Sequence, residues 1–217
     1  MTSLPILFQD EWLVAIDKPP GVLVHPSDQP KPDDLVAMKI LRDQVGEKIH
    51  VIHRLDQPTS GVLIFATDRG AARKIRQDFE KRRIKKRYLA MVHGRPSTDR
   101  WTCRAPLKKT PEAPKRSAET SFRVLERERP QIALVEAIPN SGRFHQIRRH
   151  LLYSGHPIIG DFRYQHYNIC KEAWERLGIG TRMLLQAKSL EFQHPITKNQ
   201  LTIEAPEDPY LVDLPKK

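Results

Sequence analysis

The chain has 217 residues, with a hydrophobic content of 39% and a charged content of 29%, so a globular fold is expected rather than disorder. It carries 37 Lys and Arg against 26 Asp and Glu, and this net charge of +11 favours a polyanionic partner. No run approaches the roughly 18 apolar residues of a membrane span, and no secretory signal is visible. The two cysteines, Cys103 and Cys170, form no CxxC pair. We therefore expect a reduced, cytoplasmic protein.

The first 66 residues predict strands around one helix. Short β-branched runs between Pro and Gly predict strands at 5–8, 12–16 and 22–25, and at the two ends of 50–66. Between them, 33–46 predicts a helix that is capped by Asp33 or Asp34 and stopped by Gly46.

The middle of the chain begins with a helix at 67–82, capped by Thr67 or Asp68. Ala72, Ile75 and Phe79 face inward in this helix, and its basic residues face outward. A strand at 85–94 follows, and then a mobile loop rich in Pro and Lys at 106–119.

The last part predicts a strand pair and then helices and strands in turn. Helix 143–155 should turn Phe144, Ile147 and Leu151 inward. The remaining elements are strands at 120–126 and 131–138, a helix near 171–178, and strands at 184–192 and 200–205. Together these elements predict one α+β domain over residues 1–217.

Basic residues are concentrated in two places. Ten Lys and Arg lie between Arg69 and Arg87, against Asp78 and Glu80. A second group lies in "SGRFHQIRRH", residues 141–150. A solvated basic helix face is the alternative, but this clustering favours nucleic acid.

The loop "HRLDQPTSG", residues 53–61, stands directly before the apolar run "VLIFA". Pro58 stiffens it, so Asp56 is expected on a short rigid loop at the edge of the core. Arg54 lies two residues earlier, on the same face of an extended stretch, and would keep the carboxylate ionised. The alternative is a loop salt bridge with a turn-capping Asp.

His53, His145 and His150 resemble metal ligands only superficially. The sequence contains no HExxH motif, no Cys cluster and no nearby carboxylate pair. We therefore expect structural or RNA-contacting histidines and no metal.

Five segments together resemble the RluA-type pseudouridine synthases, in the order in which that family has them. Besides "HRLDQPTSG" they are "KPPGVLVH" (18–25), "KKRYLAMVHG" (85–94), "SGRFHQIRRHL" (141–151) and "GHPIIGDFRY" (155–164). The resemblance spans about residues 4–205 and implies one catalytic domain with a mixed, mostly antiparallel sheet and flanking helices.

The resemblance also implies roles for individual residues. Asp56 would be the catalytic carboxylate, either attacking the ribose or abstracting one of its protons, with no metal or organic cofactor. Arg54 would fill the space that a flipped-out uridine leaves. Tyr88 would lie against the uracil, Ile147 beside it, and Arg148 would pair with Asp56.

The expected partner is RNA, acted on by a monomer that does not associate with membranes. The motifs are most similar to a branch of the family that modifies a uridine in the acceptor/T-stem part of tRNA; ribosomal RNA, or both RNAs, is the alternative. The small RNA-binding S4 domain of several relatives is not seen, so RNA selection would rest on the catalytic domain and its inserts, 107–118 and 162–182.

Two other classes are weighed against this interpretation. A non-catalytic RNA-binding module should prefer a neutral or basic residue to Asp56 beside phosphates. A glycoside hydrolase would need two partnered carboxylates, and the motifs contain no second one.

Overall fold

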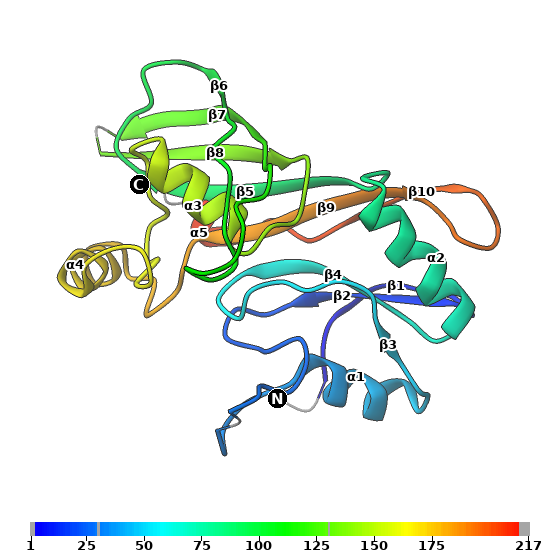
Figure 1. The fold of residues 1–217 in the computed structure, drawn as a ribbon. Coiled ribbons are helices and arrows are strands. Elements are labelled where there is room, and N and C mark those ends of the chain that lie inside the picture. Colours follow the sequence, from blue (N-terminus) through cyan, green and yellow to red (C-terminus); the bar gives the residue numbers. More distant parts are fainter. Residues whose placement is uncertain (1–2, 30, 130, 213–217) are drawn as a thin grey trace. The chain divides into compact units, whose positions relative to one another are not determined.

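The structure is a computed structural model that describes residues 3–29, 31–129 and 131–212. The chain forms two compact units (Figure 1). Unit 1 contains the chain up to Lys85 together with Ala187–Pro206, and unit 2 contains Lys86–Gln186 and the chain from Glu207 on.

Unit 1 is built on antiparallel strands with two helices. Its elements are β1 (Ile6–Gln9), β2 (Leu13–Lys18), α1 (Ala37–Val45), β3 (His50–Val51), β4 (Ser60–Ala66), α2 (Arg69–Glu80), most of β9 (Leu185–Gln193) and β10 (Gln200–Glu204). The strands run in the order β1-β2-β4-β9, with β10 paired to β9 and β3 paired to β4. Lys18 at the end of β2 lies opposite Gly61 near the start of β4. The turn that follows β2 and the turn that precedes β4 are therefore neighbours.

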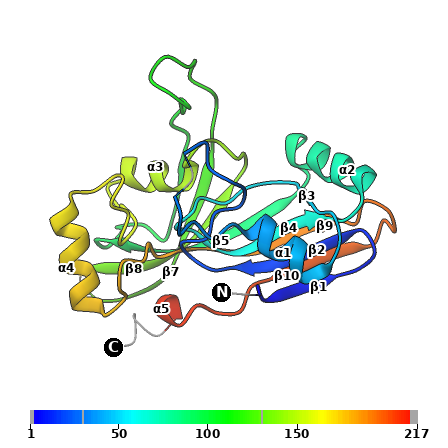
Figure 2. The same cartoon turned by 90° about the horizontal axis from the view of Figure 1, so that it is seen from below.

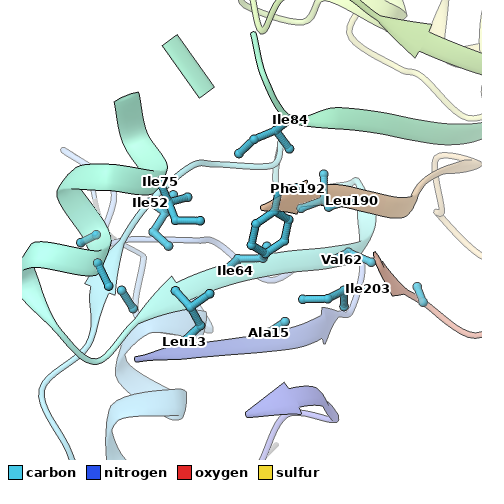
Figure 3. Close-up of a cluster of buried hydrophobic side chains, with 14 residues drawn as sticks. Leu13, Ala15, Ile52, Val62, Ile64, Ile75, Ile84, Leu190, Phe192 and Ile203 are labelled. Atoms are coloured by element: carbon cyan, nitrogen blue, oxygen red, sulfur yellow. The ribbon is translucent and has the colours of Figure 1, made fainter. Parts of the chain in front are cut away.

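The core of unit 1 joins its strands to α2. Figure 3 shows Ile64 of β4, Ile75 of α2 and Phe192 of β9 in one buried cluster. All seven residues of β4 are buried, which explains why "VLIFA" is apolar without alternation. This cluster fixes the strand that follows Asp56.

Unit 2 is an antiparallel sheet with helices. Its elements are β5 (Lys85–His93), β6 (Arg100–Cys103), β7 (Thr120–Arg129), β8 (Ile132–Pro139), α3 (Gln146–Tyr153), α4 (Tyr167–Leu177) and α5 (Pro209–Val212). The strands run in the order β5-β8-β7-β6. Ile147 and Leu151 of α3 pack in one hydrophobic cluster with β5, β7 and β8, and Trp174 of α4 packs in another. Figure 2 shows the same elements from below.

The α+β fold with mostly antiparallel strands is confirmed, and the extent of a single domain over 1–217 stays a prediction. Most elements are found within a few residues of their predicted bounds. Asp68 caps α2 as predicted, since its side chain accepts a hydrogen bond from Ala71 N. Gly46 ends α1 in the left-handed conformation.

Several local predictions are wrong. Residues 22–25 form only a bridge between Leu23 and Val36, not a strand. Neither Asp33 nor Asp34 caps α1, which begins at Ala37, because Asp34 accepts from Lys31 N in the preceding turn. Helix α4 begins four residues earlier than predicted, and β6 and α5 were not predicted.

The predicted loop at 106–119 is confirmed as a connection without helix, and its mobility stays a prediction. Leu107 is buried and pairs with Arg116 across the base of the loop. Within the described ranges, no helix has the length and apolar character to cross a bilayer.

Gly61 occupies a position in β4 that tolerates no side chain. Its φ of +103° is one that residues with a Cβ rarely adopt. A Cβ there would lie 2.2 Å from the carbonyl oxygen of Ala187 in β9. The Gly in "TSGVL" is thus required by the close approach of two strands.

We predict that Gly61→Ala lowers the free energy of unfolding by about 2–4 kcal/mol, because backbone strain and strand displacement add. Urea denaturation measures this change. Gly142→Ala is the matched control, since a Cβ at that position would meet no atom within 4 Å and its φ is not positive. Equal midpoints for both variants would contradict the prediction.

Candidate active site

Asp56 lies on a short turn between β3 and β4 in unit 1. Thr59 N donates to Asp56 O at 3.0 Å, which closes the turn. Leu55 is buried, Asp56 is half-buried and Gln57 is exposed. The backbone of Asp56 is thus held on a buried anchor while its side chain reaches the edge of the core.

The side chain of Lys18 connects this turn to the one that follows β2. Lys18 is fully buried, and its Nζ donates to three carbonyl oxygens: Pro19 at 2.8 Å, Val22 at 2.9 Å and Gln57 at 3.0 Å. Gly21 N also donates to Gln57 O, and Gln57 Nε2 donates to Gly21 O. The segment 19–22 and the loop that carries Asp56 therefore form one hydrogen-bonded structure.

The charge of Lys18 is set by opposing effects. Burial lowers its pKa from 10.5 to about 7, and the negative charges of Asp56 and then Asp17 oppose the shift. The three carbonyl acceptors suit an ammonium group, which has three N–H donors. Lys18 and the loop that carries Asp56 are therefore coupled both by hydrogen bonds and by charge.

His53 fixes the beginning of the same loop. Its Nε2 accepts a hydrogen bond from Ile64 N at 3.0 Å, so the ring proton is placed on Nδ1. Its ring stacks on Phe79 of α2, with centroids 4.6 Å apart. His53 therefore has a structural role in this loop. Arg54, the next residue, has an exposed side chain, as a group that contacts RNA requires.

In unit 2, Arg148 is held by a buried ion pair. Its Nε and Nη2 donate to the two carboxylate oxygens of Asp161, at 2.8 and 2.7 Å, and both side chains are at most 5% exposed. The guanidinium also lies over the ring of Tyr164, 5.2 Å from its centroid. Such bidentate pairing fixes the plane of the Arg148 guanidinium. The predicted pairing of Arg148 with Asp56 stays a prediction.

Tyr88 and Ile147 are brought together as parts of one hydrophobic cluster. Tyr88 of β5 lies opposite Ala137 of β8 and is partly buried against this cluster. Ile147 of α3 is a member of the cluster and has 7% of its surface exposed. The two side chains thus supply aromatic and aliphatic surface in the same region of unit 2, and their predicted place beside the uracil stays a prediction.

The other two histidines differ in their surroundings. His150 is fully buried, with Nδ1 facing Thr120 Oγ1 and Nε2 facing Ala105 O, and burial lowers its pKa. His145 Nδ1 lies 2.8 Å from Tyr164 Oη. Among the described residues, no group of three or more His, Cys, Asp and Glu could hold a metal ion.

Two residues that shape the site, Lys18 and Asp161, have no role that the sequence predicts. Lys18 was visible only as part of "KPPG", and Asp161 only as part of "HPIIGD". A Lys that ends a buried strand directly before Pro-Pro is the signal that could have identified the first. Nothing in the spacing of Arg148 and Asp161 indicates their pairing, because it depends on tertiary contact.

Comparisons with known proteins agree with one another. The family model described as RNA pseudouridylate synthase matches residues 12–153. The tRNA pseudouridine synthase C of Pasteurella multocida is 36% identical over 98% of this chain and 95% of its own length. That of Haemophilus ducreyi is 37% identical over 94% and 90%.

Solved structures give the same fold. The human RNA pseudouridylate synthase domain containing 4 matches with a TM-score of 0.76 and 26% identity, over 97% of this chain and 91% of that one. The human domain containing 1 matches with a TM-score of 0.80 at 24% identity, over 98% and 88%, and shows likeness of fold alone.

We predict that the contribution of Lys18 to stability increases with pH above 7. Folded Lys18 loses its proton near pH 7, whereas unfolded Lys18 keeps it to about 10.5. Over this window the unfolded state binds more protons, so stability rises with pH by up to about 1.4 kcal/mol per pH unit.

The measurement is the free energy of unfolding of the wild type minus that of Lys18→Met, from urea denaturation between pH 7.5 and 9.5. The subtraction removes the titration of all other lysines. A difference that stays constant or falls over this range would contradict the prediction.

Proposed function

The chain belongs to the RNA pseudouridylate synthase family, and from this premise we propose that it isomerises uridine to pseudouridine in tRNA, with Asp56 as the catalytic carboxylate. The observation that carries this proposal is the rigid display of Asp56, on a turn bonded to the buried Lys18 through Gln57 O. A reacting carboxylate gains from such fixed placement because less motion is lost in the transition state.

The reaction rearranges one nucleoside without net change in atoms. The bond between ribose C1′ and uracil N1 breaks, the uracil turns, and a bond forms between C1′ and C5. C5 loses its proton and N1 gains one. The ionised carboxylate of Asp56 attacks the ribose or abstracts a ribose proton, and neither route draws on a metal or an organic cofactor.

The remaining site residues hold the uridine. Tyr88 and Ile147 offer apolar surface to the uracil, and a Tyr ring can stack on a base. Arg54 reaches into the RNA and occupies the place of the flipped-out nucleotide, whose displacement costs a few kcal/mol. Asp161 orients the Arg148 guanidinium, and that fixed orientation is suited to the pairing of Arg148 with Asp56.

The substrate we propose is a uridine in the acceptor/T-stem part of tRNA, modified in the cytoplasm by a monomer. The curated relatives that cover nearly the whole chain carry tRNA in their names. Modification of ribosomal RNA, alone or in addition, is the alternative that mapping of pseudouridines would reveal.

The exposed face of α2 supports binding to RNA. Figure 2 shows this helix beside β3 and β4 of unit 1. Arg73 and Lys74 are exposed on it, while Arg76 is held by Val51 O. The pKa of His50 in β3 is lowered by burial and, next, by the positive charges of Lys48, Arg76 and Arg69. A positive potential over this face suits phosphate groups.

Asp56→Asn should lower the rate of pseudouridine formation by roughly a thousandfold or more, because the amide can neither attack nor accept a proton. Tritium release from C5-labelled uridine in a tRNA transcript measures it. Asp43→Asn, at an exposed position in α1, is the control. We expect tRNA affinity to be unchanged in both variants, and thermal stability to be unchanged in Asp43→Asn. Asp56→Asn removes a negative charge that faces the buried Lys18, so thermal melting of this variant shows whether the fold is kept. A folded and fully active Asp56→Asn would remove this mechanism.

The double variant Arg73→Glu/Lys74→Glu should weaken tRNA binding and lower the slope of log affinity against log salt by about 1.5, since each lost phosphate contact contributes roughly 0.7–0.9. Filter binding between 50 and 300 mM KCl measures the slope. Lys31→Glu/Lys39→Glu, at two exposed positions with the same change of net charge in unit 1, should keep the wild-type slope. If both double variants changed the slope equally, the exposed face of α2 would not be the surface that binds RNA.

A further inference from the structure

Unit 2 exposes aromatic side chains beside α3 that the proposed reaction does not use. Phe162 is 60% exposed and Phe144 is 38% exposed, although helix periodicity predicts Phe144 inward. Exposed large aromatic residues in a charged setting are characteristic of binding surfaces. We call Phe144, His145, Phe162, Arg163 and Tyr164 the aromatic surface.

The backbone before α3 turns Phe144 away from the core. His145 has a φ of +51°, a left-handed conformation that is uncommon for residues with a side chain. Two contacts accompany it: a ring stack of Phe144 on His145, with centroids 3.7 Å apart, and the hydrogen bond between His145 Nδ1 and Tyr164 Oη. Strain of this kind, held in place by neighbours, points to a functional placement of Phe144.

The segment that carries Phe162 is fixed at three points. Asp161 forms the buried pair with Arg148, Tyr164 N donates to Asp161 O at 3.1 Å, and the side chain of Gln165 donates to Ile158 O. Phe162 is therefore presented on a rigid turn, so binding on its ring requires little ordering of the chain.

The charge around these rings is positive. Between residues 141 and 167 the only acid is Asp161, which Arg148 neutralises, whereas Arg143, Arg149 and Arg163 remain. The Arg163 guanidinium lies 5.8 Å from the centroid of the Phe144 ring. Aromatic faces combined with arginines suit a partner that has flat rings and negative charge, which is the chemistry of an unpaired nucleotide. An apolar protein partner would leave these arginines unpaired.

We propose that the aromatic surface stacks the base of an unpaired nucleotide of the RNA, next to the uridine that is modified. Arg163 and Arg143 contact the phosphates of this nucleotide. Its place follows from one contact with a site residue and from the sequence: the Arg148 guanidinium lies over the ring of Tyr164, and His145 is two residues before Ile147 along the chain. The proposal rests on the proposed function for the identity of the RNA, but stacking can be measured separately.

The test compares Phe144→Leu/Phe162→Leu with Phe144→Tyr/Phe162→Tyr. The leucine pair keeps apolar bulk without a ring, whereas the tyrosine pair keeps the ring. The probe is a fluorescein-labelled, ten-nucleotide single-stranded RNA of mixed sequence. We expect the leucine pair to weaken binding roughly 5- to 100-fold and the tyrosine pair to stay within about twofold of the wild type.

A second readout uses the tRNA transcript. The leucine pair should raise KM with little change in kcat, because the aromatic surface does not touch the reacting atoms. Tyr153→Leu, at an exposed aromatic position at the end of α3 and outside the aromatic surface, should change neither quantity. Thermal melting of each variant shows whether the fold is kept.

The outcomes separate this proposal from the proposed function. Leucine variants that bind the oligonucleotide like the wild type would overturn the stacking role, as would equal losses in the leucine and tyrosine pairs. Suppose that the wild type forms no pseudouridine in any tRNA, while the leucine pair binds the oligonucleotide more weakly than the wild type. This outcome would overturn the proposed function and would still support the stacking role of the aromatic surface.

Discussion

Lys18 has to find three acceptors and compensating negative charge inside the protein, because its ammonium group is shielded from water. The carbonyl groups of Pro19, Val22 and Gln57 meet this need, and Asp56 and Asp17 supply the charge. The three carbonyls come from the two turns that leave β2 and precede β4. The hydrogen bonds of this one buried side chain thus link the two turns and hold the loop that displays Asp56, and Gly61 lets the following strand approach β9.

The same principle operates in unit 2, where Asp161 satisfies the buried guanidinium of Arg148. This pair fixes the start of the segment leading to α4, and the segment in turn holds Tyr164 against His145. Two buried contacts, one in each unit, therefore hold the backbone of the Asp56 loop and the guanidinium of Arg148. Such fixed placement within each unit is what the proposed function requires of these residues.

The sequence predictions failed where a tertiary contact overrode a local preference. Asp34 has the character of an N-cap, but it accepts from Lys31 N in its own turn and the helix begins at Ala37. Helical periodicity places Phe144 inward, but His145 adopts a left-handed conformation and α3 begins only at Gln146. Residues 22–25 are β-branched, yet Val22 O is an acceptor for Lys18 and only a bridge to Val36 remains.

The sequence by itself determined the class of fold, the cores of most strands and helices, and the family, and it predicts Asp56 as the catalytic residue. Apolar periodicity and motif order are local properties that a linear chain displays directly. Only the tertiary structure decided that Lys18 donates a hydrogen bond to the loop that carries Asp56, that Asp161 orients the Arg148 guanidinium, and that Phe144 and Phe162 face solvent. These depend on which groups meet after folding, since a buried charge is stable only where the fold brings its partners to it.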